Sequence, residues 1–141
     1  MEKWIIYAII SMLFAGITSV IAKFGMKNLS SDTALAIRTA VVFAIVVANA
    51  FIFKNAISEL KQAPAQNLIF LIISGITTSL SWIFYYKAMK EGQVSYVASI
   101  DKASIVVTLL LSFLILKEPA TPKVLIGAAF IFTGMIILVW K

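Results

Sequence analysis

Five long apolar stretches constrain the fold of this chain more than any other feature. They cover residues 4–22, 33–53, 68–88, 94–116 and 124–140. A helix needs roughly 20 apolar residues to cross the ~30 Å hydrocarbon layer of a bilayer. Backbone groups in lipid must be hydrogen-bonded within the chain, so such stretches span as helices. We therefore predict an all-α integral membrane protein, with one transmembrane domain of five helices over residues 1–141.

The composition supports this prediction. Of the 141 residues, 62% are hydrophobic and only 13% are charged, whereas soluble domains carry about 25% charged residues. The first apolar run is long enough to span, so we interpret it as a retained helix and not as a signal peptide. The net charge of +6 comes from bases near the ends of apolar runs. Bases in such positions meet lipid headgroups, so we do not expect nucleic-acid binding.

Several functional classes lack the residues that they need. The chain has no cysteine and no histidine, which excludes disulfides, thiolate metal sites and the usual proton switch. We find no nucleophile with a histidine base, no glycine loop for phosphate and no metal-ligand cluster. The sequence therefore predicts no catalytic residue, no metal site and no cofactor, and we do not expect an enzyme.

The joints between the stretches carry signals for helix ends. Ser30 or Ser31 is suited to the N-cap of the second helix. Gly92 stands where the third helix should stop. Thr121 and Pro122 suit the N-cap and first position of the last helix. The longest polar segment, KNAISELKQAPAQN, is expected to be a short interfacial piece that ends at Pro64.

The basic residues of the loops do not favour either orientation in the membrane. Lysines and arginines in short loops set orientation by accumulating on one side. Each side here has five: Lys3, Lys54, Lys61, Lys117 and Lys123 on one, and Lys23, Lys27, Lys87, Lys90 and Lys141 on the other. Either another feature sets the orientation, or the chain inserts both ways up and pairs with an inverted copy. Transporters commonly use two inverted halves, so an antiparallel homodimer of ten helices is one prediction.

Polar side chains form stripes at helical spacing inside the spans. The fourth span has one of Asp101, Ser104, Thr108 and Ser112, and the third has one of Ser74, Thr78, Ser81 and Tyr85, with Trp82 beside it. In lipid, such faces turn toward partners or water. The first span has a stripe of small residues, Ala8, Ser11, Ala15, Ser19 and Ala22, which indicates close helix packing.

Three ionisable residues lie within spans: Arg38, Asp101 and Lys102. A charge at the bilayer centre costs about 3 kcal/mol on insertion scales. The short side chain of Asp101 needs a cation or water. Arg38 and Lys102 are the available cations, with Lys23 a further possibility. Two interpretations stay open. The charges form a buried ion pair that fixes the helices in register, or they line a polar cavity that admits a substrate.

The segment IFYYKAMKEGQVSYVASIDKASIVVTLLLSFLILKEPATPKVLIGAAFIFTGMIIL resembles the EamA-type repeat of the drug/metabolite transporter superfamily. The resemblance extends over essentially the whole chain. Its most specific features are YKAMKEG at the end of the third span, LKEP after the fourth, and glycines in the last. Most of the superfamily carry two inverted five-helix repeats, whereas this sequence has one. The resemblance thus implies a homodimer that rebuilds the ten-helix unit.

The resemblance also implies which residues face the substrate. In this family the cavity is lined by the first, third and fourth helices of each repeat, so Ser11, Trp82, Tyr85 and Asp101 would face it. Glu118 matches an acidic residue after the fourth helix, which we interpret as a structural cap. The related small multidrug resistance exporters use a glutamate in the first helix to exchange protons for cations. The first span of this chain has no acid.

Together these observations predict a transporter of a small metabolite or drug-like solute, an exporter or exchanger that works by alternating access. We expect it in the inner membrane of a prokaryotic cell, with the bilayer, the solute and a second copy of the chain as partners. The candidate substrate-binding residues are Ser11, Arg38, Trp82, Tyr85, Asp101 and Lys102. Two cations beside one acid favour an anionic or zwitterionic solute. The alternative is a non-transporting subunit that scaffolds or regulates a larger complex.

Overall fold

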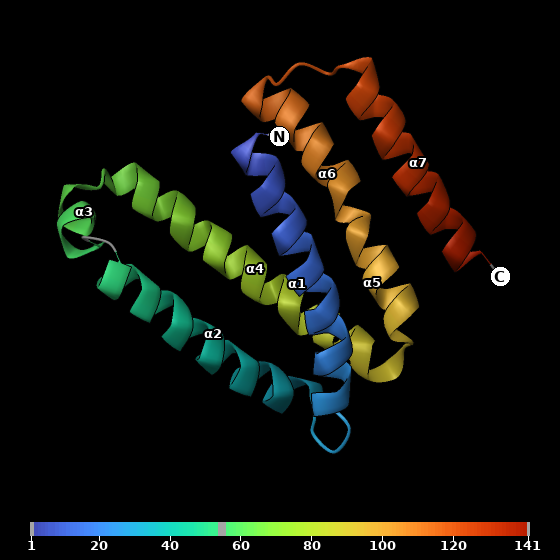
Figure 1. Ribbon diagram of the computed structural model, residues 1–141, viewed down its shortest axis with the longest axis horizontal. Coiled ribbons are helices and arrows are strands. Elements are labelled where there is room, and N and C mark those ends of the chain that lie inside the picture. Colours follow the sequence, from blue (N-terminus) through green and yellow to red (C-terminus); the bar gives the residue numbers. More distant parts are fainter. Residues whose placement is uncertain (1, 54–55, 141) are drawn as a thin grey trace. The chain divides into compact units, whose positions relative to one another are not determined.

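The computed structural model of the protein describes residues 2–53 and 56–140, and every regular element in these ranges is a helix (Figure 1). The helices are α1 (Lys3–Gly25), α2 (Ser31–Phe53), α3 (Ala56–Gln62), α4 (Ala65–Glu91), α5 (Val94–Lys102), α6 (Ser104–Leu111), the π-helix η1 (Ser112–Leu116) and α7 (Pro122–Val139). Five stretches are long and apolar enough to cross a membrane: α1, α2, α4, the run Val94–Leu116, and α7. The predicted all-α fold with five candidate spans is confirmed.

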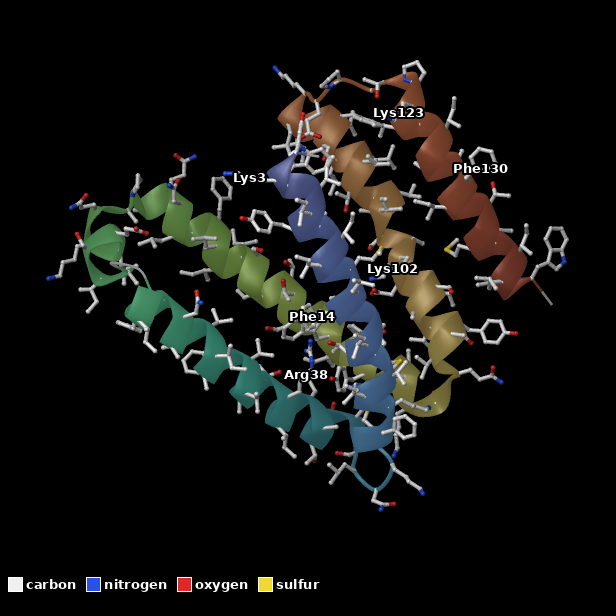
Figure 2. All side chains as sticks on the ribbon, in the orientation of Figure 1. Lys3, Phe14, Arg38, Lys102, Lys123 and Phe130 are labelled. Atoms are coloured by element: carbon white, nitrogen blue, oxygen red, sulfur yellow. The ribbon has the colours of Figure 1, made fainter. Side chains whose placement is uncertain are left out.

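The surface of these helices suits lipid and not water. Large apolar side chains project from every span (Figure 2), and Phe14 of α1 and Phe130 of α7 are 67% and 75% exposed. A soluble protein does not expose apolar surface on this scale. The exposed side chains therefore lie where the acyl chains of the bilayer, or another protein chain, cover them.

The chain divides into two compact units, Met1–Glu91 and Gly92–Lys141. The first contains α1 to α4, and the second contains α5, α6, η1 and α7. That residues 1–141 act as one transmembrane domain stays a prediction.

In the first unit, α2 and α4 pack side by side and α3 lies between them in sequence (Figure 1). The buried residues gather at one end of the unit. They are Met26, just after α1, Leu35 in the first turns of α2, and Tyr86 and Met89 in the last turns of α4. The core thus forms where the carboxyl ends of α1 and α4 meet the amino end of α2.

Two lysines connect these carboxyl ends. Lys23 Nζ of α1 donates a hydrogen bond of 2.5 Å to the carbonyl of Met89, and Lys90 Nζ of α4 donates one of 2.6 Å to the carbonyl of Met26. The last carbonyls of a helix have no partner in their own helix. Cations are also favourable at the negative end of the helix dipole. The reciprocal bonds hold α1 against α4 close to the core.

Several predicted helix ends are confirmed. The side chain of Ser30 accepts a hydrogen bond of 3.2 Å from the backbone N–H of Thr33, so it caps α2. Helix α4 stops at Glu91, directly before Gly92. Pro122 is the first residue of α7, and Thr121 holds the N-cap position without a side-chain hydrogen bond.

In the second unit, α7 packs against α5 and α6 (Figure 1). The predicted fourth span, 94–116, is less regular than the sequence suggests. At Ala103 the backbone hydrogen bonds join residues three apart. Ala103 N–H donates to Ile100 O (2.9 Å), and Val106 N–H donates to Ala103 O (3.0 Å). The span ends in the π-helix η1, and Lys117 turns the chain with a left-handed backbone at φ 54°.

Candidate functional site

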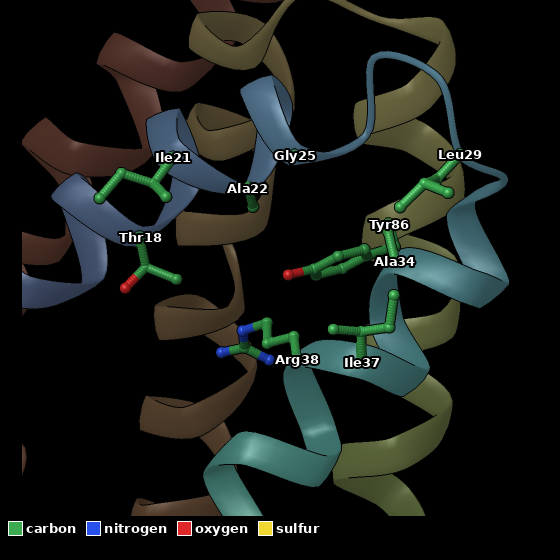
Figure 3. A pocket seen from close by; sticks show the side chains of 9 residues that line it. All are labelled: Thr18, Ile21, Ala22, Gly25, Leu29, Ala34, Ile37, Arg38 and Tyr86. Atoms are coloured by element: carbon green, nitrogen blue, oxygen red, sulfur yellow. The ribbon is translucent and has the colours of Figure 1, made fainter.

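The first unit contains a cavity of about 300 Å³ between α1, α2 and α4. Its lining is apolar apart from three side chains (Figure 3) and consists of Thr18, Ile21, Ala22, Gly25, Leu29, Ala34, Ile37, Arg38 and Tyr86. Ligand pockets have volumes of roughly 300–1,000 Å³ and are mainly apolar with a few placed polar groups. This cavity has that character and lies at the small end of the range.

Arg38 is the charged group of this cavity. It lies seven residues after the start of α2, about 10 Å along the helix, and its guanidinium extends into the cavity (Figure 3). The central carbon of the guanidinium lies 4.4 Å from the ring centroid of Trp82 and 5.8 Å from that of Tyr86. Trp82 and Tyr86 are four residues apart on α4, so they share the face that meets α2.

The hydrogen-bonding capacity of Arg38 is not satisfied within the described residues. Its Nη1 atom is buried and has no hydrogen-bond partner there. The aromatic rings attract the face of the cation, but they do not accept the N–H groups along its edge. No carboxylate of residues 2–53 and 56–91 forms an ion pair with Arg38. The cavity therefore contains a positive group whose donors lack a fixed acceptor from its own unit.

Tyr86 is the site residue that sequence analysis missed. The stripe on the third span pointed to Tyr85, whose hydroxyl lies 2.9 Å from Ser19 Oγ of α1 and so links α4 to α1. It is Tyr86 that is buried and lines the cavity. The sequence signal that could have identified Tyr86 is its spacing from Trp82, because residues four apart lie on the same face of a helix.

Ser11 does not line this cavity. It lies on α1, about two turns before Thr18, and is exposed on this chain. Thr18 donates a hydrogen bond of 2.7 Å to the carbonyl of Phe14 one turn earlier. Its donor is thus used within its own helix, while its oxygen still has capacity to accept.

Asp101 and Lys102 belong to the second unit, at the end of α5. Lys102 Nζ lies 3.5 Å from Asp101 Oδ2, and the two side chains are 66% and 38% exposed. The pair joins neighbours in sequence at the end of one helix, directly before the irregular turn at Ala103. This contact lies within one helix and does not itself fix two helices in register. That the charges fix helices in register through other partners stays a prediction. That Asp101 or Lys102 contacts a solute stays a prediction.

Other kinds of site are not supported in the part of the chain that the structure describes. No group of three or more Asp, Glu, His or Cys residues there could hold a metal ion. A second cavity of about 190 Å³, between α6, η1 and α7, has only apolar lining residues, among them Leu109, Phe113 and Phe132. The Arg38 cavity combines a charge, an aromatic ring and an apolar wall.

Comparison with known proteins identifies the family. Residues 2–140 match the EamA-like transporter family. This chain belongs to the EamA-like transporter family. The expectation from YKAMKEG, LKEP and the glycines of the last span is thereby confirmed. No solved structure matches the chain.

A curated relative of this EamA-like chain is an uncharacterized transporter in the cobO 3′ region of a Sinorhizobium species. It is 34% identical over 137 residues, which cover 97% of this chain and 96% of the relative. With five candidate membrane-spanning helices, these findings identify a multi-pass membrane protein of a transporter family. They point to a transporter rather than to an enzyme.

Proposed function

We propose that this protein is a secondary transporter, an exporter or exchanger of a small metabolite or drug-like solute, that works by alternating access in the inner membrane of a prokaryotic cell. The observation that carries the proposal is the cavity between α1, α2 and α4, with Arg38 stacked on Trp82 and Tyr86. An ionisable side chain inside a membrane span is costly, and such residues mark substrate or ion pathways. The family membership and the transporter name of the Sinorhizobium relative support this direction.

We propose further that two inverted copies form the working unit. The lysines in the loops and near the helix ends are divided five and five between the two predicted sides, so neither orientation is favoured by charge. Secondary transporters place substrate near the middle of the membrane, where two inverted halves meet. One five-span repeat supplies one half, and a second copy in the opposite orientation would supply the other.

Asp101 is the proposed coupling acid, because it is a carboxylate within a candidate span and has a cation beside it. Lys102 is its proposed cation partner. Ser11 and Tyr85 are proposed solute contacts on the resemblance alone. Arg38, Trp82 and Tyr86 carry the larger share of the proposal, because Arg38 and Tyr86 line the cavity and the Trp82 ring contacts the Arg38 guanidinium.

The test is solute counterflow in proteoliposomes with the purified protein and a broad metabolite panel. Ala34 lines the cavity and Ala36 lies on the exposed side of the same helix. We expect Ala34→Phe to fill the cavity and to lower counterflow about tenfold or more, the effect of losing ~1.4 kcal/mol of binding. Ala36→Phe, the matched control, should retain most of the rate.

Two results would contradict the proposal. Equal counterflow in both variants would remove the cavity from the transport path. No flux for any solute, together with co-purification of another membrane subunit, would favour a scaffolding or regulatory subunit.

A further inference from the structure

We propose that the cavity binds a small amphipathic organic anion, and that the Arg38 guanidinium holds its oxyanion group while the apolar wall holds its body. This inference rests on the proposed function, because it names the class of solute that the cavity takes. It commits to the Arg38 cavity of the first unit and makes no use of Asp101 or Lys102.

Arg38 gives the cavity a positive charge. Arg38 is the only arginine of the chain, and its buried Nη1 has no hydrogen-bond partner among the described residues. The cavity lining contains no acid that would balance it. A buried N–H donor without an acceptor is unfavourable. An anionic ligand would supply the missing acceptor, whereas a cationic ligand would add a second positive charge.

The guanidinium of Arg38 lies against two aromatic rings. Trp82 lies 4.4 Å from it, with Tyr86 at 5.8 Å on the same helix. Stacking of this kind leaves the N–H donors in the plane of the guanidinium free. Those donors match the two oxygens of a carboxylate, which makes bidentate, charge-assisted hydrogen bonds with arginine. The aromatic rings thus orient the group for a planar oxyanion.

The rest of the cavity wall is mainly apolar. Ile21, Leu29 and Ile37 supply branched aliphatic surface. The hydroxyl of Tyr86 also projects into the cavity near Arg38 (Figure 3), where it can donate to the same oxyanion. A fully hydrophilic anion would leave the aliphatic wall without contacts. The volume of about 300 Å³ restricts the ligand to a small molecule.

The experiment measures binding with probes that differ only in charge. The first series is phenylacetate, phenylacetamide and phenethylammonium, and the second is hexanoate, hexanamide and hexylammonium. Trp82 is the reporter, in full-length protein in nanodiscs that carries Trp4→Phe and Trp140→Phe to remove the other two tryptophans. We expect both carboxylates to bind at least about tenfold more tightly than the matching amide, and the ammonium compounds to bind more weakly still.

Variants at one position assign the effect to the guanidinium. Arg38→Gln should remove the preference for carboxylate, and Arg38→Lys should keep part of it, because lysine keeps the charge but not the bidentate geometry. Lys61→Gln removes a positive charge from α3, outside the cavity, and should change nothing. The comparison of probes in protein with Arg38 intact does not depend on whether these variants fold.

The outcomes separate this inference from the proposed function. Equal or tighter binding of the amide or ammonium probes would overturn the anion class, and so would the absence of binding by all six. Carboxylate binding that depends on Arg38, without counterflow of any solute, would support the anion site and overturn transport. Counterflow of cations or neutral solutes alone would leave transport standing and overturn the anion class.

Discussion

At the scale of single residues, the environment of Arg38 is the most informative feature of the molecule. A charge at the bilayer centre costs about 3 kcal/mol on insertion scales. Trp82 and Tyr86 offset part of that cost through their ring faces. A cation–π contact contributes about 0.5–1 kcal/mol when exposed and about 2 kcal/mol when desolvated. The two rings therefore stabilise Arg38 without satisfying its hydrogen-bond donors.

This arrangement makes Trp82 a residue with a graded effect on stability. We expect Trp82→Leu to lower the free energy of unfolding by about 1–2 kcal/mol, because it removes the ring closest to the guanidinium. Trp82→Phe should cost less, since a smaller ring remains. Thermal unfolding in detergent, followed by circular dichroism, measures both. Trp4→Leu, at the exposed start of α1, is the control. Equal effects of Trp82→Leu and Trp82→Phe would mean that the contact with Arg38 contributes nothing.

The sequence identifies Arg38 and Trp82 but points to Tyr85 instead of Tyr86. Arg38 stands out because it is a charge inside an apolar run. The two tyrosines are neighbours, about 100° apart around α4, and Tyr85 shares its face with the polar stripe of Ser74, Thr78 and Ser81. The choice depends on which neighbouring helix each face meets. Packing against α1 brings Tyr85 to Ser19, and packing against α2 brings Tyr86 to Arg38.

At the scale of helices, lengths and ends follow from the sequence better than internal irregularities do. Ser30, Gly92 and Pro122 mark ends by known local chemistry, and the structure agrees. The interruption at Ala103 was not predicted, because the segment ASIDKAS has no glycine or proline. The π-helix Ser112–Leu116 likewise has no distinctive residue.

The end of η1 leads to a prediction about Lys117. Its φ of 54° lies in the left-handed region, which costs a non-glycine residue roughly 1 kcal/mol. We therefore expect Lys117→Gly to stabilise the protein by up to about 1 kcal/mol and Lys117→Val to destabilise it by a similar amount. Thermal unfolding in detergent provides the measurement.

Lys123 is the matched control, because it is also exposed but lies in the first turn of α7. There a glycine should destabilise by about 0.5–1 kcal/mol, so the sign of the Lys→Gly effect should reverse between the two positions. If Lys117→Gly destabilised as much as Lys123→Gly, the left-handed turn after η1 would be contradicted.

At the scale of the whole molecule, the balanced loop charges lead to a prediction about membrane orientation. The chain has no cysteine, so single cysteines can be introduced without a background. In the antiparallel dimer, Lys27→Cys and Lys117→Cys should each react with a membrane-impermeant maleimide from both sides of the membrane. Labelling of whole cells and of inverted vesicles measures this. If each position reacts from one side only, mixed insertion is wrong, and a parallel dimer or another partner remains.

The central claim is that the guanidinium of Arg38 contacts the transported solute. Because the chain has a single arginine, phenylglyoxal, which is selective for arginine, can modify this group alone in proteoliposomes, and intact-mass spectrometry can count the adduct. We predict that counterflow falls in proportion to the modified fraction, and that a transported solute slows the modification. Complete modification of Arg38 with unchanged counterflow would contradict the claim.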